Sequence, residues 1–208
     1  MMPLRLYAIA LDDVRVIFHA PPDAAVALRA IARDQFAPDA SAGKSAWFSR
    51  PSSRRLPADH PAADDIDTLL AGRFVRPERL VPSWRLIETW IAAMAWGCHR
   101  TGLDAAQIDA IDFDLAKAGV APSLSLRSLV SRWDEPVRFA PGLVAGTAPG
   151  TQADAMLAAW TAVDEEVDDD HRDAVNGCRE WFAQFPGWRD AAAAQHRPPP
   201  DLVAIFGG

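Results

Sequence analysis

Acidic side chains are concentrated between residues 164 and 173, where seven carboxylates and one histidine occur in ten positions. Carboxylates stacked at helical spacing repel one another, so this density carries a local cost in stability. The plainest interpretation is a solvated acidic helix face or a helix break, and the functional alternative is a surface that binds a basic protein. The candidate contact residues for such a partner are Asp164, Glu165, Asp168, Asp169, Asp170 and Asp173.

The same stretch contains one pair of residues with the spacing of a metal site. Asp168 and His171 lie three positions apart, which puts a carboxylate and an imidazole on one helix face, as in helical-bundle metal centres. The sequence holds no second acidic-x-x-His pair, and it lacks the spaced ligands and central glycine of a calcium loop. A metal-dependent hydrolase that uses Asp168, His171 and groups from another helix is therefore the alternative function. No cofactor is indicated.

Residues suited to nucleophilic catalysis do not form a recognisable site. Cys98 adjoins His99, but neighbours on a helix point about 100° apart, so the thiol and the imidazole do not meet. Cys98 and Cys178 are each expected on the buried face of a helix. The sequence has neither a Gly-x-Ser-x-Gly elbow nor a His-Glu-x-x-His helix. These absences favour a protein without catalytic activity.

Both ends of the chain have the pattern of a buried strand. Residues 4–11 carry apolar side chains in both alternating registers, which is typical of a strand covered on both faces. Residues 201–208 form a compact apolar run of the kind that a soluble protein does not leave exposed. We expect the two segments to pair with each other.

Helical periodicity dominates between the two ends. The strongest pattern covers residues 83–100, which place five residues on one face: Ile87, Trp90, Ile91, Met94 and Cys98. Further helices are expected at about 104–119, 123–133, 151–185 and 188–195. The third of these contains the acidic stretch and is expected to break near it.

Two segments lack clear helical or strand periodicity. Residues 37–62 read as a long irregular loop, and residues 136–150 are rich in proline and glycine, with a short strand at about 137–139. The length of 208 residues fits a single domain over 1–208. We predict an α+β fold that is mostly helical, with helices packed on a small sheet formed by the N-terminal and C-terminal strands.

Charge and hydropathy limit the classes of partner. Asp and Glu outnumber Lys and Arg 28 to 21, and the net charge of -7 would repel a nucleic-acid backbone. No apolar segment approaches the roughly 20 residues of a membrane-spanning helix, and residues 1–13 lack the pattern of a signal peptide. We expect a cytoplasmic protein that binds neither nucleic acid nor membrane.

Tryptophan is unusually frequent, with eight residues against one tyrosine. Those at positions 84, 90 and 96 fall on different faces of a single helix, so they cannot all share one core stripe. Exposed tryptophans on a self-complementary face would indicate an oligomeric structural or regulatory module, a third candidate function. Sequence alone does not determine the oligomeric state.

The two ends of the chain share a pattern with known proteins. The N-terminal part of the pattern is Leu4-Arg5-Leu6-Tyr7-Ala8-Ile9 followed by Leu11-Asp12-Asp13-Val14. The C-terminal part is Leu202-Val203-Ala204-Ile205-Phe206-Gly207. This pattern resembles the YfbM-like uncharacterised bacterial proteins. The resemblance implies an α+β fold without established catalytic residues and a role as a binding partner, including that of an immunity protein for a toxin. With the acidic charge, it favours a non-enzymatic protein-binding module that neutralises a basic toxin.

Overall fold

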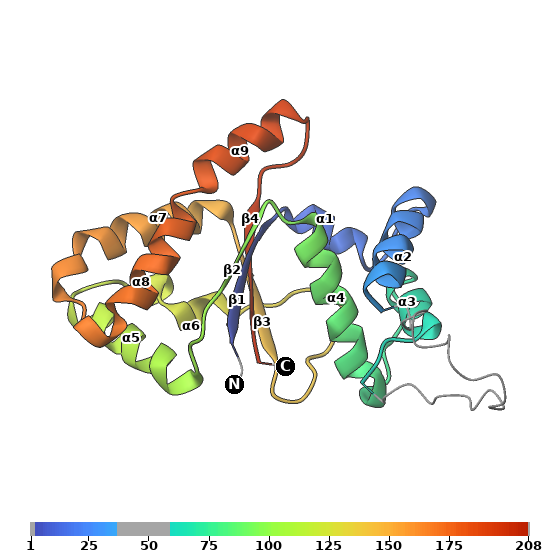
Figure 1. The fold of residues 1–208 in the computed structure, drawn as a ribbon, viewed down its shortest axis with the longest axis horizontal. Helices are drawn as coiled ribbons and strands as arrows, with labels where there is room; N and C mark the ends of the chain where they lie inside the picture. The colour runs from blue at the N-terminus through green and yellow to red at the C-terminus, as the bar shows by residue number, and fades with distance from the viewer. Residues whose placement is uncertain (1–2, 37–58, 208) are drawn as a thin grey trace, which may run out of the picture.

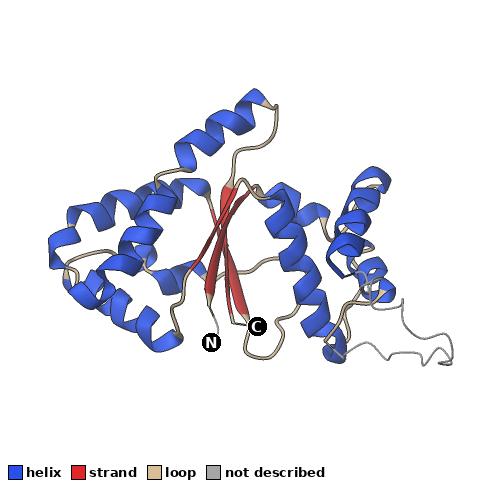
Figure 2. Cartoon of the chain, viewed as in Figure 1, coloured by secondary structure: helices blue, strands red, loops and turns tan. Residues whose placement is uncertain are grey.

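The computed structural model describes residues 3–36 and 59–207. Its centre is a four-stranded antiparallel sheet in the order β2-β1-β4-β3. The strands are β1 (Leu4–Ile9), β2 (Gly97–Arg100), β3 (Val144–Ala148) and β4 (Asp201–Phe206). Helices cover both faces, and the sheet lies between two helical layers (Figure 1, Figure 2). The predicted mostly helical α+β fold, with helices packed on a sheet that contains both terminal strands, is confirmed.

The helices divide by sequence between the two faces of the sheet (Figure 1). One layer contains α1 (Leu11–Val16), α2 (Pro22–Phe36), α3 (Ala63–Leu70), the short helix η2 (Pro77–Arg79) and α4 (Leu80–Met94). The other contains α5 (Ala105–Lys117), η3 (Pro122–Leu124), α6 (Leu126–Leu129), α7 (Gly150–Ala162), η4 (Asp164–Glu166) and α8 (Asp169–Phe182). The last helix, α9 (Phe185–Ala194), lies beyond one end of the sheet and leads into β4.

The two inner strands explain the apolar pattern at both ends of the chain. β1 pairs with β4 from Leu4↔Phe206 to Ile9↔Asp201, so the predicted pairing of the ends is confirmed. Side chains alternate across a strand, and those of Leu4 and Leu6 pack under α5–α8 while that of Tyr7 packs under α1–α4. Because each strand is covered on both faces, both registers must be apolar.

The predicted helix over residues 83–100 is wrong in its last turn. α4 ends at Met94, and residues 97–100 form the edge strand β2 beside β1. The chain leaves the helix at Ala95, whose backbone is extended, and the Trp96 amide donates to the Ala8 carbonyl. Cys98 is consequently exposed on a strand, and the prediction that it lies in the core is also wrong. Sheet pairing has overridden a local helical pattern here.

The predicted strand at residues 137–139 is also wrong, because the strand of this segment is β3, at Val144–Ala148. A Cβ atom at Gly146 would lie 2.1 Å from the Leu129 carbonyl oxygen, so only glycine permits this approach of β3 to α6. Glycine and alanine are poor strand formers, and they hide the strand from sequence analysis.

Other expectations differ mainly in their boundaries. The helical region at 151–185 is broken at the acidic stretch, as predicted, into α7, η4 and α8. The helix expected at 123–133 is only α6 with η3 before it. Most of the long loop at 37–62 lies outside the described residues, as does Trp47.

None of the seven tryptophans that the structure describes is exposed. Among the described residues, no helix is long and apolar enough to cross a bilayer.

Candidate functional site

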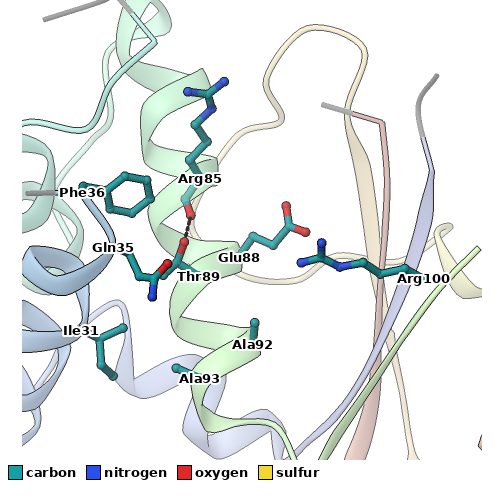
Figure 3. A pocket seen from close by; sticks show the side chains of 9 residues that line it. All are labelled: Ile31, Gln35, Phe36, Arg85, Glu88, Thr89, Ala92, Ala93 and Arg100. Carbon is teal, nitrogen blue, oxygen red and sulfur yellow. Dashed lines mark hydrogen bonds between the residues drawn. The ribbon is translucent and has the colours of Figure 1, made fainter. Parts of the chain in front are cut away.

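A concave surface follows α4. Two adjoining hollows of about 570 and 390 Å³ share Arg85, Glu88 and Arg100, and together we call them the α4 groove. The larger hollow lies between α2, α4 and β2 (Figure 3). Its described lining consists of Ile31, Gln35, Phe36, Arg85, Glu88, Thr89, Ala92, Ala93 and Arg100. Volumes of this size are typical of small-molecule sites.

Helical spacing in α4 determines which side chains line the groove. Trp84, Ile87 and Trp90 are buried against the sheet and α2, which fixes the orientation of the helix. The opposite face carries Arg85 and Glu88 followed by two small residues one turn later, Ala92 and Ala93. The small side chains leave the space that the larger hollow occupies.

A buried polar network closes the base of the groove. Arg5, on β1, places its Nε atom 2.5 Å from Glu88 Oε1. The Tyr7 hydroxyl donates to the same oxygen at 2.7 Å. Arg5 also donates to the Gly207 carbonyl oxygen at 2.7 Å, so its charge is paired and its guanidinium is anchored inside the fold. Glu88 is thereby held by the charge of Arg5 and the hydrogen bond from Tyr7.

The environment of Tyr7 keeps its hydroxyl protonated. Desolvation by burial raises the pKa of Tyr7 well above its ordinary value, and the negative charge of Glu88 raises it further. Tyr7 is therefore a permanent hydrogen-bond donor to Glu88 at all ordinary pH values. Its role in the site is to position the carboxylate.

The two remaining arginines of the groove differ in their surroundings. Arg85 forms an ion pair with Asp59 at 2.8 Å, and Figure 3 shows its side chain pointing away from Glu88. Arg100 is exposed, and its guanidinium points toward Glu88 across the groove. Within the described part of the chain, the Arg100 side chain makes no hydrogen bond or ion pair.

The second candidate surface is the acidic segment, which we define as residues 164–173. It comprises η4 and the first turns of α8. Asp168 is the N-cap of α8, and its side chain accepts a hydrogen bond from the Asp170 amide. Asp169 and Asp170 stand in the first turn, where the helix dipole favours negative charge. These three acids therefore have a structural explanation.

The other members of the acidic segment divide into paired and unpaired residues. Asp164 forms an ion pair with Arg179, which joins η4 to α8. Glu165, Glu166 and Asp173 are exposed, and their side chains make no hydrogen bond or ion pair with any described residue. Three exposed carboxylates of the segment therefore have no described partner: two on η4 and one on α8.

The proposed metal pair is arranged differently from the sequence-based expectation. His171 Nδ1 lies 2.8 Å from Asp114 Oδ2 on α5, while the side chain of Asp168 caps α8. In residues 3–36 and 59–207 there is no group of three or more His, Cys, Asp or Glu side chains that could hold a metal ion. The metal site at Asp168 and His171 stays a prediction.

The two cysteines occupy unlike environments. Cys178 is buried in α8, as predicted, and desolvation raises the pKa of its thiol to about 12. Such a thiol is almost entirely protonated near neutral pH and is a poor nucleophile. Cys98 is exposed on β2, and the neighbouring His99 side chain packs instead near Trp181 of α8.

Sequence analysis did not identify the α4 groove. Arg5 gave a usable signal, because a charged residue inside a strand covered on both faces requires a buried partner. The partner, Glu88, lies 83 positions further along the chain (88 − 5) and carries no local mark of that role. Arg100 was assigned to a helix, and its place on β2 depends on sheet pairing.

Comparison with known proteins gives a match to a family model. The model, described as "Domain of unknown function (DUF7691)", covers residues 3–207. No curated protein and no solved structure matches the chain. The expectation of an uncharacterised family is confirmed, and no named relative supports the resemblance to the YfbM-like proteins.

Proposed function

The chain belongs to the DUF7691 family, whose description states no activity, and we propose that it is a non-enzymatic binding module whose acidic segment binds a basic protein. The observation that carries the proposal is the group of three exposed carboxylates, Glu165, Glu166 and Asp173, that have no partner among the described residues. Repulsion within the segment opposes folding, and a cationic partner would relieve it.

Complementary charge would act mainly on recognition and association rate. A partner with a basic surface would be drawn to a chain of net charge -7, and the attraction would weaken as salt screens it. The specific case that we propose is neutralisation of a basic toxin by occlusion of its cationic surface. Support comes from the charge pattern alone.

The test compares two variants with the same change in net charge. Glu165→Gln, Glu166→Gln and Asp173→Asn together remove three exposed acids of the segment whose side chains have no described partner. Asp34→Asn, Glu180→Gln and Asp190→Asn remove three exposed acids on α2, α8 and α9. Affinity capture from the native host, read by mass spectrometry at low and moderate salt, should retain a basic protein on wild type and on the second variant only.

Two outcomes would contradict the proposal. Equal loss of the captured protein from both variants would show that net charge, and not this segment, attracts it. Equal retention by both variants would remove the segment from the interaction. For the toxin case, the captured protein should inhibit growth when expressed alone and lose that effect when it is expressed together with wild type.

The metal-dependent hydrolase has one supporting contact, the pair formed by His171 and Asp114. A carboxylate that orients an imidazole is a common feature around catalytic metals. That pair also connects α5 with α8, which is a sufficient structural role. We therefore place the binding module first.

A further inference from the structure

We propose that the α4 groove binds a small organic oxyanion, a carboxylate or a phosphate ester with an apolar body, whose charged group contacts Arg100. The groove lies in the α1–α4 layer, whereas the acidic segment lies in the α5–α8 layer. The inference is therefore independent of the proposed function and adds a ligand site to it.

The charges of the groove leave one cation unneutralised among the described residues. Arg5 and Glu88 form an ion pair, and Arg85 pairs with Asp59. Arg100 has no such partner within the described residues, although it lines both hollows. The α4 groove thus offers a local positive charge on a chain whose net charge is negative.

The sheet register places Arg100 beside a like charge. Arg100 lies directly opposite Arg5 in the pairing of β2 with β1, so both side chains stand on the α4 face. Like charges directly opposite each other on a sheet are destabilising. Glu88 compensates for Arg5, and an oxyanion at Arg100 would complete the compensation.

The shape of the larger hollow indicates the rest of the ligand. Figure 3 shows the Arg100 guanidinium at one side of the hollow and the side chains of Ile31, Ala92 and Ala93 at another. A guanidinium recognises carboxylate and phosphate oxygens through paired N–H donors. The alanines and the isoleucine offer apolar contact, so the ligand combines an anionic head with an apolar body of small size.

Gln35 adds a polar group to the hollow. Its side chain reaches toward the space from α2 and makes no hydrogen bond with a described residue. Thr89 is less available as a donor, because its hydroxyl donates to the Arg85 carbonyl at 2.7 Å. A polar substituent on the ligand body would therefore contact Gln35 in preference to Thr89.

The test is calorimetric titration of the full chain with phenylacetate, phenyl phosphate and the uncharged phenylacetamide. At least one anion should bind, and the amide should bind about tenfold more weakly or not at all, since it lacks the charge-assisted contact. Whichever of the two anions binds with the higher affinity shows whether the site prefers a carboxylate or a phosphate ester. Arg100→Gln should weaken the anion about tenfold, and Ala92→Phe should abolish binding by filling the hollow.

Matched controls are available elsewhere in the chain. Arg132→Gln removes an exposed arginine outside the groove, and Ala158→Phe enlarges an exposed alanine on α7, and both should bind like wild type. Arg100→Gln should unfold at no lower temperature than wild type, because it loses a like-charged neighbour. Failure of both anions to bind, equal binding by Arg100→Gln and wild type, or equal weakening by Arg132→Gln would overturn the proposal.

Discussion

His171 of α8 is joined to Asp114 of α5, with Nδ1 and Oδ2 2.8 Å apart. The contact connects the beginning of α8 to the last turn of α5, a helix that the chain left more than 50 residues earlier. Both side chains are about one-fifth exposed, so the pair lies at the border of the core, where water competes only partly for the hydrogen bond.

Removal of this contact should lower stability. We expect His171→Ala to reduce the free energy of unfolding by about 1 kcal/mol, the usual net value of one hydrogen bond. Urea unfolding at neutral pH measures the change. Asp173→Asn on the same helix is the control and should change stability by less than about 0.5 kcal/mol, because its side chain has no described partner.

The same variant tests the metal alternative. A ligand that binds only the folded state raises the unfolding temperature. We expect added Zn²⁺ to shift the Tm of wild type and of His171→Ala by the same amount, because no described third ligand stands beside His171 and Asp114. A zinc-dependent increase found in wild type and lost in His171→Ala would instead favour the hydrolase.

Tyr7→Phe should have an effect that depends on pH. Near pH 8 the variant loses the hydrogen bond to Glu88, and we expect a loss of about 2 kcal/mol, as for bonds to charged groups. Above about pH 10, the unfolded wild type releases the Tyr7 proton while the folded state, whose pKa is raised by burial, retains it. The free energy of unfolding of wild type therefore falls as pH rises. The difference in this free energy between wild type and the variant should narrow.

Urea unfolding of both proteins at pH 8 and pH 11 measures this difference. Cys178 also has a raised pKa and also weakens the fold at high pH, but it is common to both proteins and cancels. A constant difference between the two pH values would show that the Tyr7 hydroxyl is not held protonated.

The two thiols should react at very different rates. Cys98 is exposed and Cys178 is buried, so we expect an aromatic disulfide reagent to modify one thiol of the native protein quickly and the second only on unfolding. Cys98→Ser should abolish the fast phase. Persistence of a fast phase in that variant would mean that Cys178 is accessible in the folded protein.

Gly146→Ala should destabilise the contact between β3 and α6. The added methyl group would overlap the Leu129 carbonyl oxygen, and the backbone on both sides must move, at a cost of about 1–3 kcal/mol. Gly187→Ala is the control, since nothing lies near its added Cβ. Gly187 lies in α9, so Gly187→Ala should leave the free energy of unfolding unchanged or raise it by up to about 1 kcal/mol. Thermal unfolding separates the two results.

The strength of local patterns explains which elements could be predicted. β1 and β4 are long apolar runs, and burial on both faces leaves them no other interpretation. The break at the acidic segment was predicted because dense like charge opposes a continuous helix. Sequence analysis missed β2 because Cys98 continues a helical pattern, and it missed β3 because Gly146 weakens a strand pattern. Both segments become strands through their pairing with β1 and β4.

The α4 groove illustrates a harder limit. Arg5 within an apolar strand indicates a buried charge. Its neighbours Glu88 and Arg100 could not be predicted, because they lie on elements whose positions depend on the completed sheet. The acidic segment is visible from sequence because its residues are consecutive. What sequence could not give is the division of that segment into capping, paired and unpaired acids, which follows from the N-cap geometry and from Arg179.

The central pairing of β1 with β4 also has a consequence for biosynthesis. The inner neighbour of β1 is synthesised almost 200 residues after β1 itself, so Leu4 cannot pair with Phe206 before then. At about 5–20 residues per second, the delay is on the order of ten seconds or more. Throughout that interval β1 lacks this neighbour, and an unpaired strand edge of this kind is open to aggregation. Completion of the sheet is therefore a late event in the life of each new molecule.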